Sequence, residues 1–175
     1  MFGTLSKHAA LLYKKETLST VDLQQIQNYV IVALFVLIPP RRSLDYTNFT
    51  NRIDPALNYL DKKTLVFNSY KTAKTYGQQI VECPPGLLKI LKKWISSNKT
   101  DWLLFDSNGG KLTPVKLNQR LNKIFGGRKI SVNSLRHSYL SGKYIDTIKV
   151  NEDLQKDMTE MGSSLKQSTT YIKKE

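Results

Sequence analysis

The stretch STVDLQQIQNYVIVALFVLIPPRR, residues 19–42, decides the architecture of the chain. It opens with the capping residues Ser19 and Asp22, and it becomes apolar on nearly every side toward Leu37. A helix that is apolar all round is normally buried, so we expect this one to form the core. Because prolines cannot continue a helix, the chain should turn at residues 39–40 and begin a second short helix.

Two arginines, Arg41 and Arg42, follow this turn at the end of the core helix. They belong to a chain of 175 residues with 27 Lys and Arg against 14 Asp and Glu, which gives a formal net charge of +13. So large a surplus favours a polyanionic partner, with nucleic acid as the first candidate and an anionic membrane surface as the second. The plainer alternative is a basic surface that only keeps the protein in solution.

The composition argues against several classes of protein. The single cysteine, Cys83, cannot form a disulfide within the chain, and the two histidines, His8 and His137, are too few for a zinc cluster. The apolar run at 29–38 has 10 residues, about half of what a membrane span needs, and the first residues lack the pattern of a signal peptide. These features favour a cytoplasmic or nuclear protein with no metal site and no membrane span.

The middle of the chain predicts a small sheet. Segments rich in β-branched and aromatic residues near 57–60, 64–70 and 78–83 read as strands. The last two flank the lysine-rich connection KTAKTYG at 71–77, which we expect to be the exposed tip of a hairpin. The expected sheet is therefore three-stranded and antiparallel.

Helices are predicted around this sheet and after it. Prolines and capping residues mark the starts of helices after Pro84, at Thr113, at Ser131 and at Asn151. The helix from Ser131 should end before Asn151, and the helix from Asn151 should stop at Gly162. A last helical segment is expected at 164–175. The fold class is therefore α+β and mainly helical.

Four short motifs stand in a particular order along the chain. They are RSLD at 42–45, the tip KTAKTYG at 71–77, NSLRHS at 133–138 and MGSSLKQSTTYIK at 161–173. In this order they resemble the catalytic domain of the tyrosine recombinase (phage integrase) family, and the resemblance covers about residues 20–174. It implies the catalytic-domain fold of that family.

The resemblance also implies roles for individual residues. The catalytic positions that it assigns are, in chain order, Arg42, Lys71, Asn133, Arg136, Ser163 and Tyr171. The positions that it assigns to DNA contact are Arg41, Lys74 and His137. Arg42 is preferred to Arg41 as the first arginine because the family has an acid three residues further on, and Asp45 supplies one for Arg42.

These residue types suit the cleavage of a phosphodiester without a metal. Arg42 and Arg136 can neutralise the charge on the non-bridging oxygens through bidentate hydrogen bonds. A phenol has a pKa of about 10 and needs activation, so Tyr171 depends on the cationic pocket or on a base. A lysine held among cations can act as the acid for the leaving 5′ oxygen, which is the role expected of Lys71.

Asn133 and Ser163 depart from the family pattern. Asn133 stands where a histidine is expected, and Ser163 stands where a second histidine or a tryptophan is expected. Neither side chain exchanges a proton near neutral pH. Since one acid–base group is worth roughly 10²–10⁴ in rate, their presence predicts a slow or inactive enzyme.

We expect an enzyme that cuts and rejoins DNA through a covalent 3′-phosphotyrosyl link at Tyr171, in site-specific recombination or integration, encoded by a virus or a mobile element. The resemblance implies double-stranded DNA as the partner, four copies assembled on DNA, and no cofactor. It also implies a single catalytic domain over residues 1–175, without the N-terminal DNA-clamping domain of the family.

Three alternatives stay open. A type IB topoisomerase has a similar set of arginine, lysine and tyrosine, but it relaxes DNA without a specific site. A catalytically impaired relative would serve only as a DNA-binding module, as Asn133 and Ser163 suggest. An unrelated basic RNA-binding domain would prefer RNA to duplex DNA and would be indifferent to Arg136→Ala.

Overall fold

A computed structural model describes residues 1–162 of the chain. The chain divides into two units, Met1–Arg136 and His137–Glu175. The described part of the second unit is most of helix α7 (Val132–Glu160), followed by a turn. The prediction of one catalytic domain over residues 1–175 stays a prediction.

The core of the first unit forms around α2 (Thr20–Val36). The Ser19 hydroxyl accepts a hydrogen bond from the Asp22 N–H, and the Asp22 carboxylate accepts one from the Ser19 N–H, so the predicted cap is present. The interior residues of α2 are buried, with Ile26, Val30 and Ile31 fully so. The predicted buried helix is confirmed.

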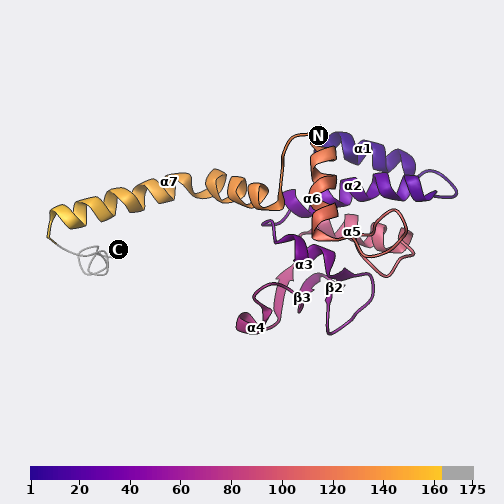
Figure 1. The fold of residues 1–175 in the computed structure, drawn as a ribbon, viewed down its shortest axis with the longest axis horizontal. Helices are drawn as coiled ribbons and strands as arrows, with labels where there is room; N and C mark the ends of the chain where they lie inside the picture. The colour runs from indigo at the N-terminus through magenta and orange to yellow at the C-terminus, as the bar shows by residue number, and fades with distance from the viewer. Residues whose placement is uncertain (163–175) are drawn as a thin grey trace. The chain divides into compact units, whose positions relative to one another are not determined.

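Two further helices pack against α2. They are α1 (Phe2–Leu12), which lies beside it in Figure 1, and α5 (Pro85–Ser97), which begins at the second of the prolines at 84–85, as predicted. Trp94 of α5 is fully buried, stacks on Phe105 with ring centroids 5.8 Å apart, and donates its indole N–H to the Leu103 carbonyl at 2.8 Å. These contacts fasten the loop after α5 to the core.

Gln27 is a buried polar residue in this apolar helix. Its amide nitrogen donates to the Phe105 carbonyl at 2.9 Å, and its amide oxygen accepts from the Phe105 N–H at 2.8 Å. The amide therefore pairs with both backbone groups of one residue of the loop, which satisfies polar groups that would otherwise be buried without partners.

The sheet has four strands in the order β1-β2-β3-β4. They are β1 (Phe49–Thr50), β2 (Asn58–Asp61), β3 (Thr64–Phe67) and β4 (Gln79–Glu82). The three predicted strands form, and β2, β3 and β4 are antiparallel neighbours. The prediction of a three-stranded antiparallel sheet is nevertheless wrong, because β1 adds a strand that runs parallel to β2 and makes the sheet mixed.

The extra strand has no signal of its own in the sequence. It has only two residues, too few for an alternating pattern. Its place depends on tertiary contacts: the Leu103 N–H donates to the Phe49 carbonyl at 2.9 Å, and Thr50 forms an isolated bridge with Trp102. Such pairing with a distant loop cannot be read from a local pattern.

The prolines at 39–40 end the core helix, and the short helix α3 (Ser43–Thr47) follows, as predicted. Figure 1 shows α3 between the helices and the strands of the first unit. The β3–β4 connection is mostly exposed, as expected, but its tip is a short helix, α4 (Ala73–Tyr76), that ends at Gly77 with a φ of 65°. A positive φ favours glycine at this position.

Two helices complete the described chain. In α6 (Pro114–Ile124), the Thr113 hydroxyl caps the first turn by accepting from the Lys116 N–H at 3.2 Å, as predicted. The two helices predicted from Ser131 and from Asn151 are instead one helix, α7, so this prediction is wrong.

Asn151 has the side chain of a capping residue but lies inside α7, and the segment before it contains no proline. Gly142, also inside α7, costs a helix only about 1 kcal/mol relative to Ala. Neither residue is therefore enough to stop the helix. The helical segment predicted at 164–175 lies outside the described residues.

The mainly helical α+β class is confirmed for the described part of the chain. Within residues 1–162, no helix combines the length and the apolar character needed to cross a membrane.

Asn58 is the polar residue that joins α3 to the end of β3. It is fully buried, and its amide oxygen accepts from the N–H groups of Asn68 and Ser69, both at 2.8 Å. Its amide nitrogen donates to the carbonyls of Asp45 at 2.7 Å and Ser69 at 2.9 Å. One side chain thus holds the start of the β3–β4 connection against α3.

We expect Asn58→Ala to lower the free energy of unfolding by about 3 kcal/mol, because it leaves buried donors and acceptors without partners at roughly 1–3 kcal/mol each. Urea unfolding followed by circular dichroism measures this change. Asn108→Ala, at an exposed position, is the matched control and should change stability by less than about 0.5 kcal/mol. Equal stability of Asn58→Ala and the wild type would contradict the bridging role.

Candidate functional site

A polar cleft of about 320 Å³ lies in the first unit where α3 begins. Its walls come from the turn after α2, from α3, from the β3–β4 connection and from the first turn of α7. The residues that line it are Pro39, Pro40, Arg41, Arg42, Asp45, Tyr70, Thr72, Tyr76, Gln79 and Arg136. Three of these are arginines and one is an acid, so the cleft carries net positive charge.

Arg41 is fixed on several sides. Its Nε donates to the Asp45 carboxylate at 2.8 Å, and its Nη2 donates to the Gln79 side-chain oxygen at 2.9 Å. The guanidinium carbon lies 3.8 Å from the centre of the Phe67 ring and 5.3 Å from that of Tyr70. With 18% of its side chain exposed, Arg41 is a largely buried part of the cleft wall.

The backbone of Arg41 is held by Tyr46. The phenol of Tyr46 accepts a hydrogen bond from the Arg41 N–H at 3.1 Å and donates one to the Leu34 carbonyl at 3.0 Å. Tyr46 is fully buried, and burial raises its pKa, so the hydroxyl keeps the proton that it donates. The end of α2 and the start of α3 are thereby linked through one side chain.

Asp45 is the buried acid of the cleft. One of its carboxylate oxygens, Oδ2, accepts from Arg41, whereas Oδ1 has no hydrogen-bond partner among the described residues. Burial raises the pKa of the Asp45 carboxyl, and the charges of Arg41, Arg42 and Arg136 oppose this rise. We expected Asp45 to accompany Arg42, but its ion pair is with Arg41, four residues earlier in the chain.

Arg42 and Arg136 reach the cleft from distant parts of the first unit's sequence. Arg42 is the N-terminal flanking residue of α3 and is half-buried. Arg136 is half-buried on α7. Neither forms an ion pair within residues 1–162, which leaves both guanidinium groups available to a ligand.

The start of α7 is anchored so that Arg136 faces the cleft. The Ser131 hydroxyl accepts from the Ser134 N–H at 3.1 Å, as expected of the predicted cap, and the Ser134 hydroxyl accepts from the Ser131 N–H at 2.9 Å. The Val132 side chain is buried, and its N–H donates to the Asn118 side chain of α6 at 3.0 Å. Helix α6 therefore fixes the first turn of α7.

The predicted lysines lie on the β3–β4 connection. Lys71 is exposed and does not line the cleft, but its neighbours Tyr70 and Thr72 do. Lys74 is exposed on α4. The structure thus brings three arginines together and places Lys71 at the rim beside them.

The structure does not add the other predicted site residues to this group. Asn133 is exposed on α7 and does not line the cleft, and the exposed His137 belongs to the second unit. Ser163 and Tyr171 lie outside the described residues. The catalytic roles assigned to all of these residues stay predictions.

Sequence reasoning missed four polar residues of the cleft as site residues: Tyr70, Thr72, Tyr76 and Gln79. Nothing in their local pattern distinguishes them from ordinary residues of a hairpin. The ion pair of Arg41 with Asp45 had no local signal either, because Arg41 precedes the first residue of α3 and the helical spacing rule does not apply to it.

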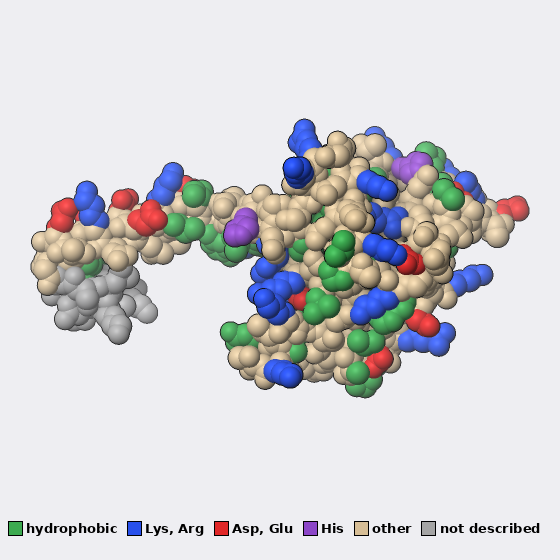
Figure 2. Space-filling view, viewed as in Figure 1, with side chains coloured by type: hydrophobic (Ala, Val, Ile, Leu, Met, Phe, Trp, Pro, Cys, Tyr) green, Lys and Arg blue, Asp and Glu red, His purple; other side chains and the backbone are tan. Residues whose placement is uncertain are grey.

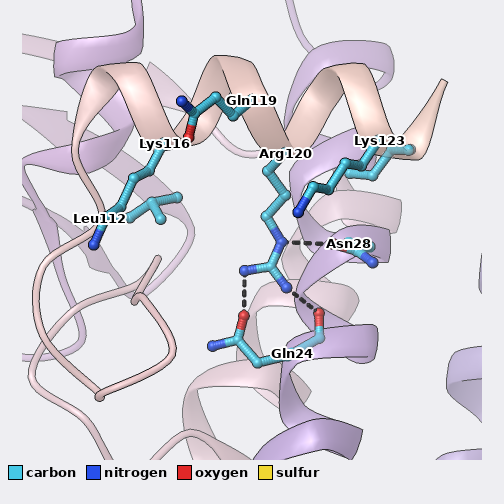
Figure 3. A pocket seen from close by; sticks show the side chains of 8 residues that line it. Gln24, Asn28, Leu112, Lys116, Gln119, Arg120 and Lys123 are labelled. Atoms are coloured by element: carbon cyan, nitrogen blue, oxygen red, sulfur yellow. Dashed lines mark hydrogen bonds between the residues drawn. The ribbon is translucent and has the colours of Figure 1, made fainter. Parts of the chain in front are cut away.

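A second basic pocket, of about 380 Å³, lies between α2 and α6 (Figure 3). Arg120 extends from α6 and donates to the Asn28 side chain at 2.7 Å and to the side chain and carbonyl of Gln24. Burial lowers the pKa of Arg120 to about 10, so the guanidinium stays charged at neutral pH. Each of the three guanidinium nitrogens of Arg120 therefore donates to a residue of α2. Arg120 joins α6 to α2, and its guanidinium is not free to bind a ligand through two hydrogen bonds.

The surface of the first unit is basic over a wide area. Figure 2 shows Lys and Arg side chains spread across the visible face, with few acidic side chains between them. In the described part of the chain, no three or more His, Cys, Asp and Glu side chains gather where they could hold a metal ion.

The chain matches no model of a protein family and no curated protein. Among solved structures, it is similar to a crystal structure of the XerH site-specific recombinase bound to its difH substrate in a pre-cleavage complex. The TM-score is 0.44 at 20% sequence identity, and the match covers 81% of this chain and 41% of the recombinase chain.

The chain therefore spans less than half the length of that recombinase. A structural similarity this low does not establish a family. Membership in the family that the sequence motifs resemble therefore stays a prediction.

Titration of Asp45 should make the free energy of unfolding depend on pH. A carboxyl whose pKa is higher in the folded state than in the unfolded state binds its proton more tightly when folded. The free energy of unfolding should therefore decrease as the pH rises from the ordinary value of 3.8 through the raised pKa of Asp45. Asp45→Asn cannot titrate, so its stability should lack this decrease.

Urea unfolding of both proteins between pH 4 and pH 7 measures the difference. Asp146→Asn, which removes one exposed carboxylate, is the matched control and should follow the wild type. If the stabilities of wild type and Asp45→Asn change in parallel with pH, the raised pKa of Asp45 is wrong.

Proposed function

We propose that the cleft binds one phosphate of double-stranded DNA and that the chain cuts and rejoins DNA through Tyr171. One observation carries this proposal: Arg42 and Arg136, which are far apart in the sequence, line the same cleft without forming ion pairs in the described part of the chain. Buried or half-buried arginines without acidic partners suit a ligand that supplies the negative charge.

The size and charge of the cleft fit this ligand. A volume of about 320 Å³ accommodates a phosphate with parts of the adjoining sugars, and the net positive charge of the lining favours an anion. The net charge of +13 on the whole chain provides for additional phosphates along a duplex. Exposed basic residues such as Lys74 and His137 are proposed to contact those phosphates.

In the proposed reaction, the guanidinium groups of Arg42 and Arg136 donate hydrogen bonds to the two non-bridging oxygens of the phosphate. The charge on these oxygens grows as the Tyr171 oxygen attacks phosphorus, so the arginines stabilise the transition state more than the ground state. A bond forms between phosphorus and the tyrosine oxygen, and the bond between phosphorus and the 5′ oxygen breaks.

Lys71 donates a proton to the departing 5′ oxygen, while the phenolic proton of Tyr171 leaves to a base or to water. The product is a 3′-phosphotyrosyl ester and a free 5′-hydroxyl. Attack of a 5′-hydroxyl on this ester reverses every step and rejoins the strand. No energy-rich cofactor is needed, because the ester retains the energy of the broken bond.

Asn133 and Ser163 have narrower roles in this scheme. Each side chain can donate a hydrogen bond to a phosphate oxygen, but neither can move a proton near neutral pH. The proposed enzyme is therefore slower than one with histidines at both positions, by roughly 10²–10⁴ for each missing acid–base group.

The biology that we propose is site-specific recombination or integration, carried out inside a cell in the cytoplasm or the nucleus. Exchange between two DNA sites involves four strands, each of which needs its own nucleophile. Four copies of the chain assembled on two duplexes would supply them.

Covalent trapping on DNA tests this function directly. Incubation with a pool of nicked duplexes of random sequence should yield a protein–DNA adduct that survives denaturing gel electrophoresis, because the short fragment released beyond the nick diffuses away and prevents rejoining. Mass spectrometry after nuclease digestion should place the nucleotide on Tyr171. Tyr171→Phe should abolish the adduct, whereas the matched control Tyr144→Phe should retain it.

Absence of any adduct with the wild-type chain would contradict strand cleavage. An undiminished adduct with Tyr171→Phe would contradict the assigned nucleophile.

A further inference from the structure

The connection between β3 and β4, residues 68–78, carries Lys71 on its exposed part. Its start is fixed by the hydrogen bonds of Asn58 and by the buried Tyr70. Lys71, Lys74 and Tyr76 are exposed, and α4 at its tip has no buried residue. The connection is closed onto itself: the Tyr70 hydroxyl donates to the Gly77 carbonyl at 2.8 Å, and the Ala73 N–H donates to the Tyr70 carbonyl at 3.1 Å. These bonds hold residues 70–77 together as one local unit.

Arg41 contacts both ends of the connection. Phe67, the last residue of β3, lies under the guanidinium at 3.8 Å, and Tyr70 follows at 5.3 Å. On the other side, Gln79, the first residue of β4, accepts from Nη2 at 2.9 Å. The same guanidinium is held to α3 through Nε and Asp45. One side chain thus ties the base of the connection to the helix that follows Arg42.

These contacts also hold the Arg41 guanidinium in one orientation. Its Nε and Nη2 already have acceptors, and the face of its guanidinium covers the Phe67 ring. Two of its five N–H donors are thus committed to Asp45 and Gln79. The neighbouring Arg42 has no such commitments within residues 1–162.

We propose that Arg41 is a positioning residue for Lys71. This inference rests on the proposed function, in which Lys71 is the acid for the leaving 5′ oxygen. An acid must lie within roughly 2.6–3.2 Å of the atom that it protonates. A displacement of about 1 Å costs on the order of 100-fold in rate. An exposed lysine on a short connection needs its base anchored: Asn58 holds the start of the connection, and Arg41 ties both ends together.

The planar guanidinium is essential to this role. Its N–H groups donate hydrogen bonds to Asp45 and Gln79, and its face stacks on the Phe67 ring. A lysine side chain at this position would keep the charge but could not span Asp45, Gln79 and the Phe67 ring together. Arg41→Lys therefore separates positioning from charge. Arg42→Lys is the matched control, because it makes the same substitution at the next residue of the chain.

The first experiment needs no activity. Amide hydrogen exchange of Ala73, Tyr76 and Gly77, whose N–H groups are bonded within the connection, should accelerate at least about 10-fold in Arg41→Lys. The same amides should exchange at the wild-type rate in Arg42→Lys, and the amides of α5 should be unaffected in both variants. Equal exchange of the connection in Arg41→Lys and wild type would overturn the proposal.

The second experiment asks whether Arg41 acts through Lys71. A duplex in which sulfur replaces the bridging 5′ oxygen has a thiolate leaving group that departs without a proton, so it bypasses the acid. With the normal duplex, we expect Lys71→Ala and Arg41→Lys each to lose about 100-fold in cleavage rate. With the sulfur duplex, both variants should recover to near the wild-type rate.

The outcomes distinguish this inference from the proposed function. If Lys71→Ala recovers and Arg41→Lys does not, Arg41 does not act through Lys71 and the inference fails. If Lys71→Ala itself does not recover, the acid role of Lys71 in the proposed function fails, while hydrogen exchange still decides whether Arg41 anchors the connection. Arg52→Gln, at an exposed arginine outside the cleft, controls for the loss of one positive charge.

Discussion

The cleft depends on one ion pair, between Arg41 and Asp45, at the start of α3. Their side chains are 18% and 3% exposed, so both charges are largely removed from water. Burial of an ion costs several kcal/mol, and a pair offsets this cost only when further contacts satisfy both partners. Gln79 and the Phe67 ring do this for Arg41, whereas Asp45 retains one oxygen without a partner in the described chain. The pair thus fixes the turn that presents Arg42, and it leaves a carboxylate oxygen beside the cleft.

Local patterns in the sequence were enough to predict most of the helices and strands. The apolar run after Ser19 gave the buried helix, and the prolines at 39–40 and 84–85 marked boundaries that the structure retains. The failures came where a local signal was weak or misleading. Helix α1 buries only Ala9 and Leu12, so its apolar periodicity is faint, and β1 exists because a distant loop pairs with it. Asn151 looked like a cap but lies within a continuous helix.

The candidate site was only partly predictable. The motif order suggested that Arg42 and Arg136 belong together, and both line the cleft. The assignment of Asp45 to Arg42 followed a spacing of three residues, but the extended backbone at Arg42, just before α3, is followed by an ion pair of Asp45 with Arg41 instead. Gln79 and Tyr70 could not be found at all, since their importance depends on strands that bring residues from distant parts of the sequence against one guanidinium. Side chains that support a site are therefore harder to predict than those that define its chemistry.

The central claim is that Arg42 and Arg136 neutralise the charge on one phosphate during strand cleavage. It can be tested on a duplex that the chain cleaves by replacing one charged non-bridging oxygen of the scissile phosphate with an uncharged methyl group. If the claim is correct, Arg136→Ala should lose on the order of 100-fold or more in cleavage rate on the normal phosphate, and it should lose much less on the uncharged methylphosphonate. An equal loss on the two substrates would contradict the claim, because it would mean that Arg136 does not act on the phosphate charge.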